Sequence, residues 1–505
     1  MAWTEGYVSE INYTYGFYGE LSPLKLALAT AIKAIHPPDL NEPFNYCELA
    51  CGRGYTTNLL ASCYPQAQFY ANDFNPNHIH EARKLAKFAG SQNVHFFDDS
   101  FAEFLEQDLP QFDFIVLHGI YSWITPENRQ AIVEFIKKKL NVGGLVYISY
   151  NALPGWAAAM PMQSLMLRHR KHSSEPILEC IEEALNLTQR LMDTNAGYFV
   201  QNPALKPRYE GLKQQNRYYL AHEYFNEQWN SFYFDEVVQE LEEAKLNFIG
   251  SANIIDYIDV LNLSQEALTE LNKIKDPIYR EVVRDFYINT QFRRDIFARG
   301  QIQMTPPEHT RVIENLRYAL IVAPNTIKLD HTFAVGNVTL QKEIYEPICE
   351  LLADSPLTMK ELHSHPNLNK NPINNVYQAL MVLTAIGYIH PAVDDETCEK
   401  RQQFTNAFNI AVIERAIVSD EMAYLASPLI GTGVVVSSLE QLLLLAVMQG
   451  EEGADFVWGI YSSQNKKLIK DGKVLEKAED NIAYIKGIAE DFYNNRLPIL
   501  ESLGI

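Results

Sequence analysis

The chain has 505 residues, too many for a single hydrophobic core, so we expect two to four domains. Hydrophobic residues make up 47% and charged residues 21% of the sequence, which excludes a disordered or fibrous protein. The formal net charge of −21 disfavours nucleic acids and anionic membrane surfaces as partners, and it favours cationic substrates, including lysine-rich proteins.

The cysteines and the apolar segments bear on the cellular compartment. Six cysteines in a chain of this length do not form a disulfide scaffold, and no Cys or His pair at zinc-finger spacing follows Cys47 and Cys51. Residues 1–6 lack the basic start and apolar stretch of a secretory signal. The apolar segment 442–448 is far shorter than the roughly 20 residues that span a bilayer. We therefore expect a cytoplasmic protein without membrane insertion.

Residues 1–156 are predicted to form an α/β domain with an aromatic and helical N-terminal extension. The extension contains Trp3, Tyr7, Tyr13, Tyr15, Phe17 and Tyr18, and a helix-like run from Pro23 to Ile35. Short apolar runs then alternate with amphipathic stretches, which indicates a Rossmann-like, doubly wound and mostly parallel sheet. The expected strands are 44–50, 68–72, 94–97, 113–117 and 145–150.

Three further regions are expected after the first domain. Residues 157–220 read as a helical connector and residues 221–330 as a helical middle domain. Within the latter, 231–245 carries an apolar stripe opposite carboxylates, and another helix is expected from Tyr279 to Phe297. Residues 331–505 are expected to form an α+β C-terminal domain.

The C-terminal region contains a helix pair followed by an apolar strand-like segment. Thr358 and Glu361 form a capping-box pattern, and Asn371-Pro372 reads as the start of a second helix. The segment 388–391 follows, and together these features predict a winged-helix-like unit. The acidity of the chain favours a role in protein contact or packing over DNA binding.

A glycine-rich turn follows the first predicted strand, in the segment 44–54 (FNYCELACGRG). Gly52 and Gly54 permit a tight turn and a close approach of ligand to backbone, and the helix N-terminus beyond them is electropositive. Asp73 ends the second predicted strand, where a carboxylate can accept hydrogen bonds from ribose hydroxyls. The combination predicts a ligand that contains a nucleoside.

Two kinds of cofactor compete for this turn. The dinucleotide fingerprint G-x-G-x-x-G requires a third glycine where Thr57 stands, which disfavours a nicotinamide-dependent oxidoreductase. Glu48, four residues before Gly52, instead matches the E/D-x-x-x-G-x-G motif of class I methyltransferases. We therefore predict S-adenosylmethionine as the cofactor and S-adenosylhomocysteine as the product. A glycine-rich turn without any ligand is the alternative.

The loop after the third predicted strand borders the adenine in the methyltransferase layout. An acid or hydroxyl there can accept from the adenine amine, and Phe101 can pack on the ring. The usual acid position aligns with Ser100, so Asp99 or Ser100 carries this contact; a helix N-cap at either residue is the compatible alternative. The predicted cofactor-binding residues are Glu48, Ala50, Gly52, Gly54, Asp73, Phe74, Asp99, Ser100, Phe101 and His118.

The loop after the fourth predicted strand is expected beside the transferable methyl group, because loops at the carboxyl ends of parallel strands form the ligand crevice. His118 is a candidate proton acceptor or, alternatively, a residue that holds the backbone. Tyr121 and Trp123 either wall a channel for an alkylamine or pack in the core. Tyr150 and Asn151, after the fifth strand, could orient the acceptor. These five residues are the predicted catalytic set.

Several blocks of the sequence resemble bacterial class I methyltransferases that carry a methyltransferase regulatory domain. The blocks of the first domain are 48–54, 118–123 and 149–155, and those that resemble the start and end of the regulatory domain are 222–235 and 289–294. The resemblance covers roughly residues 7–300 well and the remainder loosely. It extends to rickettsial protein lysine methyltransferases that modify outer-membrane proteins.

The resemblance implies a Rossmann-like catalytic domain, a helical middle region that helps dimerise, a winged-helix-like C-terminal part and an open cavity for a protein substrate. It implies that the cofactor is held by Glu48, Gly52, Gly54 and Asp73, that the acceptor side is bordered by His118, Tyr121 and Trp123, and that the cavity is closed by His222, Glu223 and Tyr224. We therefore expect a methyltransferase that modifies lysine side chains of a protein, with outer-membrane proteins as candidate substrates and a homodimer as the assembly.

Other functions are compatible with the same motifs. A small-molecule or RNA methyltransferase would share the cofactor site, although the net charge of −21 disfavours RNA. A regulator that binds S-adenosylmethionine without turnover would share it too, and only turnover separates that regulator from an enzyme.

Overall fold

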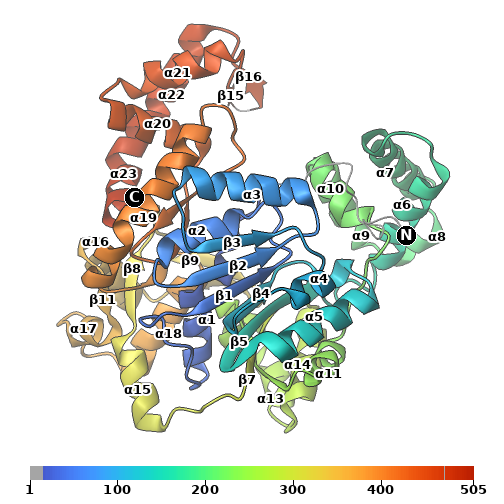
Figure 1. The fold of residues 1–505 in the computed structure, drawn as a ribbon, viewed down its shortest axis with the longest axis horizontal. Helices are drawn as coiled ribbons and strands as arrows, with labels where there is room; N and C mark the ends of the chain where they lie inside the picture. The colour runs from blue at the N-terminus through green and yellow to red at the C-terminus, as the bar shows by residue number, and fades with distance from the viewer. Residues whose placement is uncertain (1–14, 471) are drawn as a thin grey trace.

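One seven-stranded sheet lies at the centre of the computed structural model, which describes residues 15–470 and 472–505 (Figure 1). Its strand order is β3-β2-β1-β4-β5-β7-β6. The aromatic residues Trp3, Tyr7 and Tyr13 of the predicted extension lie outside the described residues.

The five predicted strands of the first domain are confirmed and run parallel. They are β1 (Asn45–Leu49), β2 (Gln68–Asn72), β3 (Val94–Phe97), β4 (Phe112–Leu117) and β5 (Leu140–Asn151). β1 pairs with β2 on one side and with β4 on the other, so the order of the strands reverses at β1. In a doubly wound sheet this reversal opens a crevice at the carboxyl ends of the strands, where ligands bind.

Helices cover both faces of the sheet, as the predicted fold class requires. They are α1 (Pro23–Ile32), α2 (Tyr55–Cys63), α3 (Pro76–Phe88), α4 (Phe101–Glu106) and α5 (Pro126–Lys139). Tyr46 and Phe114 belong to the core cluster that contains α1 and α2. Cys47 and Ile115, their neighbours in the chain, belong to the cluster that contains α4 and α5. Adjacent residues reach opposite faces because side chains alternate along a strand.

Two strands from the region predicted as a helical middle domain complete the central sheet. β7 (Phe292–Arg299) pairs antiparallel with β5, and β6 (Leu246–Ser251) pairs antiparallel with β7. The helix expected from Tyr279 to Phe297 is therefore wrong in its second half. The helix ends at Ile288, Asn289 adopts a left-handed backbone with φ of 52°, and the chain continues as a strand.

The remaining elements of residues 157–300 are helices, as predicted. The connector helices α6–α10 share their own core cluster and form the lobe at the right of Figure 1. These five helices are α6 (Met160–His172), α7 (Ile177–Asp193), α8 (Gly197–Gln201), α9 (Leu205–Gln214) and α10 (Arg217–Tyr224). The helices after them are α11 (Phe234–Glu242), α12 (Asp259–Asn262), α13 (Gln265–Leu271) and α14 (Pro277–Ile288). The apolar stripe predicted in 231–245 buries Phe234, Val237 and Leu241 on α11.

After β7, a small antiparallel sheet has the order β11-β8-β12, and β9 and β10 form a separate hairpin. The elements of residues 306–392 are α15 (Pro306–Asn315), β8 (Arg317–Leu320), β9 (Asp330–Phe333), β10 (Gly336–Thr339), α16 (Lys342–Asp354), β11 (Leu357–Thr358), α17 (Met359–Ser364), α18 (Ile373–Ala385) and β12 (Ile389–Ala392). The predicted capping box of Thr358 and Glu361 is present, and α18 begins next to Pro372. The winged-helix-like assignment stays a prediction.

The rest of the C-terminal region is mostly helical. It comprises α19 (Asp395–Arg415), β13 (Tyr424–Ser427), β14 (Thr432–Val435), α20 (Ser438–Gln449), α21 (Gly453–Ser463), β15 (Ile469–Lys470), β16 (Lys473–Val474), α22 (Ala478–Asp491) and α23 (Leu497–Ser502). None of the helices in the described part of the chain is long and apolar enough to cross a membrane.

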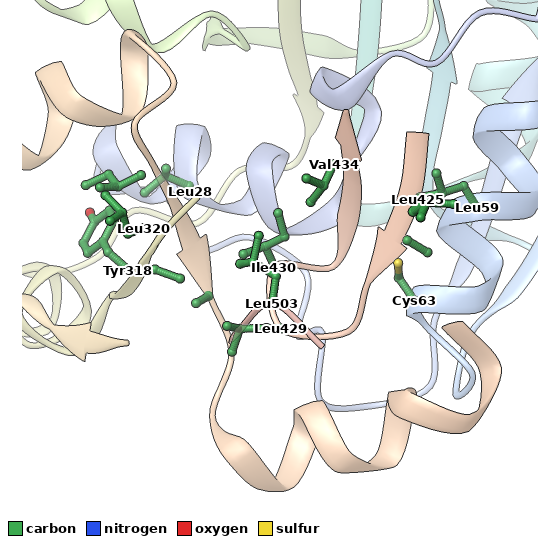
Figure 2. Packing of buried hydrophobic residues seen from close by; sticks show 14 of the residues in the cluster. Leu28, Leu59, Cys63, Tyr318, Leu320, Leu425, Leu429, Ile430, Val434 and Leu503 are labelled. Atoms are coloured by element: carbon green, nitrogen blue, oxygen red, sulfur yellow. The ribbon is translucent and has the colours of Figure 1, made fainter. Parts of the chain in front are cut away.

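The C-terminal region packs directly on α2, the helix that follows the glycine-rich turn. Leu59 of α2 and Leu425 of β13 lie in one hydrophobic cluster (Figure 2). The Tyr55 hydroxyl accepts a hydrogen bond of 2.9 Å from the Tyr424 backbone N–H. Every residue of α2 is consequently buried. The contact ties the C-terminal region to the turn that precedes this helix.

A buried ionic cluster links the neighbouring strands β5 and β7 to helix α14. Arg293 donates hydrogen bonds to Asp285 at 2.8 Å and to Asp295 at 2.9 Å, and the Tyr150 hydroxyl donates to Asp295 at 2.7 Å. All four side chains are buried. A buried charge is tolerated only when it is paired and hydrogen-bonded, so Arg293 is required to balance the two carboxylates.

We predict that Arg293→Met lowers the free energy of unfolding by about 3–5 kcal/mol, because it leaves buried carboxylates without a counter-charge. Urea unfolding followed by circular dichroism measures this change. Arg311→Met, at an exposed position of α15, is the matched control and should change stability by less than about 0.5 kcal/mol. Equal stability of the two variants would contradict the role assigned to Arg293.

Candidate cofactor and acceptor site

A cavity of about 500 Å³ lies at the carboxyl ends of the parallel strands. Its volume is within the range of about 300–1,000 Å³ that is typical of small-molecule sites. The predicted residues that line it are Glu48, Ala50, Gly52, Asp73, Phe74, Asp99, Ser100, Phe101, His118, Trp123 and Asn151. Gly54, Tyr121 and Tyr150 do not line it.

The glycine-rich turn gives the cavity a wall of bare backbone. Gly52 has φ of 55°, a conformation that L side chains rarely adopt, and no atom lies within 4 Å of the point where its Cβ would stand. A Cβ on Gly54, with φ of 67°, would approach the Ala82 Cβ to 2.5 Å. Gly52 therefore keeps space open in the cavity, whereas Gly54 allows the turn to pack on α3.

Glu48 is a buried carboxylate in the floor of the cavity, and the Thr57 hydroxyl donates a hydrogen bond to it. Burial raises the pKa of Glu48 to about 7, with a contribution from the neighbouring Asp73, and the hydrogen bond from Thr57 opposes this. Thr57, which stands where the dinucleotide fingerprint has its third glycine, is thus the hydrogen-bond partner of Glu48, the acid of the methyltransferase motif.

Asp73 is held rigidly at the end of β2. It accepts hydrogen bonds from the backbone N–H groups of Gly52 at 3.0 Å and Asn75 at 2.9 Å, and His78 Nδ1 lies 3.1 Å from Oδ1. A carboxylate offers about four acceptor positions, so these three contacts leave one for a ribose hydroxyl. Asp73 therefore both fixes the glycine-rich turn and faces the cavity.

Asp99, Ser100 and Phe101, the residues predicted to border the adenine, all line the cavity. Ser100 caps α4 and forms a capping box with Glu103, which confirms the N-cap interpretation at this position. The Asp99 carboxylate accepts a hydrogen bond of 2.9 Å from Gln107, and burial raises its pKa. The sequence analysis missed Asn72, which also lines the cavity and donates to the Asp99 carbonyl at 2.9 Å. Asn72 is the last residue of β2, next to Asp73, and a polar residue at the carboxyl end of a parallel strand could have been predicted to face the ligand.

His118 is a neutral residue in a stacked arrangement. Its ring lies 3.8 Å from the ring of Tyr18, centroid to centroid, and its Nδ1 lies 2.9 Å from the Tyr147 hydroxyl. Burial lowers the pKa of His118 to about 4, although the nearby Glu20 acts in the opposite direction. The weak basicity disfavours the predicted role of proton acceptor and favours a positioning role.

Tyr121 and Tyr150, which the sequence analysis placed in the predicted catalytic set, do not line the cavity. Both side chains are fully buried. The Tyr121 hydroxyl donates to Glu240 and the Tyr150 hydroxyl to Asp295. Tyr121 belongs to the core cluster on the α5 face of the sheet, which agrees with the core-packing alternative for this residue.

Trp123 and Asn151 do line the cavity, as predicted. The Trp123 ring lies 6.3 Å from that of Trp229, which lies 5.0 Å from that of Trp156, another lining residue that the sequence analysis missed. The Asn151 side-chain amide nitrogen is buried and has no hydrogen-bond partner among the described residues. An unsatisfied buried donor at a cavity wall is available to a ligand.

One wall of the cavity comes from the connector helix α10 and the loop after it. α10 contributes Tyr219, His222 and Glu223, and the loop after it contributes Asn226. Of the residues that the resemblance implied here, Tyr224 does not line the cavity and packs 6.4 Å from Trp156. These residues are distant in sequence from the cofactor motif, and no local pattern marked Tyr219 or Asn226.

A cluster of charges joins the glycine-rich turn to the N-terminal segment and the C-terminal region. The Arg53 guanidinium lies 3.5 Å above the Tyr15 ring, and the Tyr15 hydroxyl donates to Glu81 at 2.6 Å. Arg415 of α19 contacts both Tyr15 and Glu81, at 2.7 and 3.3 Å. Arg53 and Tyr15 line the cavity, so the C-terminal region supports one of its walls.

Comparisons with known proteins agree with this geometry. A family described as "Methyltransferase domain" matches residues 47–146, and one described as "Predicted methyltransferase regulatory domain" matches residues 216–299. The second match includes α10 and both antiparallel strands of the sheet.

Relatives match over most of the chain. An uncharacterized protein of Synechocystis is 63% identical over 505 residues, which is 100% of both chains. An uncharacterized protein of Rickettsia prowazekii is 24% identical over 75% of this chain and 72% of its own.

Among solved structures, PKMT2 from Rickettsia typhi in complex with AdoHcy has the same fold. Its TM-score is 0.71 at 20% identity, over 98% of this chain and 100% of that chain. The carboxylate-tipped β1, the bare-backbone turn and Asp73 agree with the family matches. The chain therefore belongs to the class I, S-adenosylmethionine-dependent methyltransferases that carry a methyltransferase regulatory domain.

Proposed function

We propose that this methyltransferase modifies the side-chain nitrogen of lysine in a protein substrate. The observation that carries the proposal is a single cavity whose cofactor side continues into an aromatic and acidic acceptor side. Aromatic faces and carboxylates both attract an ammonium group, and the net charge of −21 favours a cationic partner. The fold shared with Rickettsia typhi PKMT2 supports a protein substrate.

The residues at the strand ends suit an adenosyl sulfonium ligand. The open space at Gly52 is the place where backbone can approach the methionine part, Asp73 has a free acceptor position for the ribose, and Asp99 can accept from the adenine amine. S-adenosylmethionine supplies an electrophilic methyl group when it is bound. The protein's own task is to align the acceptor nitrogen and to exclude water around it.

The acceptor side supports an alkylamine substrate. Trp123 and Trp156 line it, and Phe292 of β7 adds a further aromatic wall. A lysine ammonium has no lone pair and must lose a proton before it can accept a methyl group. Burial between these aromatic side chains lowers the pKa of the ammonium, because burial disfavours the charged form. Outer-membrane proteins are candidate substrates. The homodimer, the cytoplasmic location and the domain limits at 156, 220 and 330 stay predictions.

Asp73→Asn is predicted to weaken S-adenosylhomocysteine binding at least tenfold, because the variant removes the carboxylate that faces the ribose and fixes the glycine-rich turn. Isothermal titration calorimetry measures the dissociation constant. Asp98→Asn is the matched control, since Asp98 is an exposed neighbour of the adenine loop that forms a 3.4 Å ion pair with Arg83. Unaltered affinity in Asp73→Asn would remove Asp73 from the cofactor site.

Lysine methylation is tested with isotope-labelled S-adenosylmethionine and an outer-membrane protein fraction. We expect mass shifts of one to three methyl groups on lysine, and turnover at least tenfold lower in Trp123→Ala with unchanged S-adenosylhomocysteine affinity, because that variant opens the aromatic wall. Phe88→Ala, at an exposed position of α3, should keep full turnover. Label found only in RNA or small metabolites would refute the proposed substrate class.

A further inference from the structure

Four carboxylates line the cavity among the described residues, and three of them are already engaged. Glu48 accepts from Thr57, Asp73 accepts from two backbone N–H groups, and Asp99 accepts from Gln107. Glu223 is the exception. It accepts no hydrogen bond from, and forms no ion pair with, any residue in the described part of the chain. Its oxygens are therefore available to a group that enters the cavity.

Glu223 lies on the wall that belongs to the connector helices and not to the cofactor loops. It stands on α10 one turn after Tyr219, so the two side chains share a face of the helix, and both line the cavity. His222 and Asn226 line the same wall. The Glu223 side chain is half-buried. A carboxylate that is partly removed from water normally has a hydrogen-bond donor or a cation beside it, and none of the described residues supplies one here.

We propose that Glu223 is a catalytic residue that pairs with the ammonium group of the substrate lysine and removes one of its protons. This inference rests on the proposed function. The N–H bond breaks, the proton moves to a Glu223 carboxylate oxygen, and the electron pair stays on Nζ. The lone pair then forms the N–C bond as the S–CH₃ bond of the donor breaks, with that bond's electrons remaining on sulfur. The product carries the positive charge on nitrogen, and Glu223 returns its proton to solvent.

The other ionisable groups of the cavity are less suited to this step. Burial raises the pKa of Glu223 to about 7, so its proton affinity is close to neutrality. Burial lowers the pKa of His118 to about 4, which makes it a weaker base. Burial raises the pKa of Tyr219 to about 12, with Glu223 contributing, so the phenol stays protonated. An exposed lysine ammonium has a pKa of about 10.4. Burial in the cavity lowers this pKa and so brings it closer to the pKa of Glu223.

The charged surroundings of Glu223 bear on its pH dependence. The ionisable groups that interact with it electrostatically are Tyr219 and Tyr224 of its own helix. From α9, Arg208 donates a 3.4 Å hydrogen bond to the Tyr224 hydroxyl. His222 shares its wall, and Arg294 and Glu48 lie in other walls of the cavity. Burial also raises the pKa of Glu48 to about 7, so a variant is needed to assign a titration to one acid.

The experiment measures binding of a lysine ligand instead of turnover. Protein saturated with S-adenosylhomocysteine is titrated by NMR with Nα-acetyl-lysine methylamide, and with the norleucine counterpart as the uncharged ligand. We expect wild type to prefer the lysine ligand at least tenfold and Glu223→Gln to lose this preference. Glu227→Gln is the matched control, because Glu227 is exposed and pairs with Lys171 at 3.4 Å; it should behave as wild type.

The pH dependence of the same titration has a definite sign. Between pH 6 and pH 8 Glu223 loses its proton while the ligand ammonium stays charged, so wild-type affinity should rise with pH. The rise should be absent in Glu223→Gln and retained in Glu223→Asp, which keeps a carboxylate. A rise in affinity caused by deprotonation of Glu48 would instead remain in Glu223→Gln, because Glu48 is unchanged in that variant.

The possible outcomes separate this inference from the proposed function. Lysine binding that is equal in wild type and Glu223→Gln overturns the assignment of Glu223 and leaves the proposed function standing. Failure of wild type to prefer lysine over norleucine overturns both. Binding of S-adenosylhomocysteine, measured by calorimetry, reports whether each variant is folded. If Glu223→Gln does not fold, Glu223→Asp serves as the test: a lysine affinity that no longer rises with pH in that variant overturns the inference.

Discussion

The site depends on one bend of the backbone, where β1 ends and α2 begins. Ala50, Gly52 and Gly54 all have positive φ, which glycine adopts readily but which is costly for Ala50 unless the surrounding contacts stabilise it. Asp73 contributes by accepting the Gly52 N–H, which links the ends of β1 and β2. The same carboxylate faces the cavity, so the interaction that shapes the turn also prepares the ribose contact. Preorganisation of this kind lowers the entropic cost of binding.

The C-terminal region acts on the site through this bend, although it supplies no predicted cofactor residue. Together with the sheet and α3 it buries every residue of α2, and Arg415 reaches the Tyr15 and Glu81 side chains next to Arg53. A cavity wall at Arg53 is thereby fixed from a region far along the chain. This arrangement gives the C-terminal region a physical role as a support of the cofactor turn.

The proposed acceptor side of the cavity is lined by residues from three parts of the chain, and this composition bears on its chemistry. Trp123 follows β4, Phe292 begins β7 and Glu223 lies on α10. Each part brings apolar surface that removes water, and a low-dielectric environment strengthens the effect of the few polar groups that remain. The regulatory-domain match, residues 216–299, contains two of these three residues. The matched residues 216–299 therefore form part of the cavity wall.

Local patterns of residues predicted the parallel strands, their order along the chain and the residues of the glycine-rich turn, because strand periodicity and glycine requirements are local properties. They could not decide which aromatic residues face the cavity: Tyr121 and Tyr150 are buried by contacts with Glu240 and Asp295, which are distant in the chain. Strands β6 and β7 were also missed. These points depend on tertiary contacts, because strand pairing and burial require partners that no local pattern identifies.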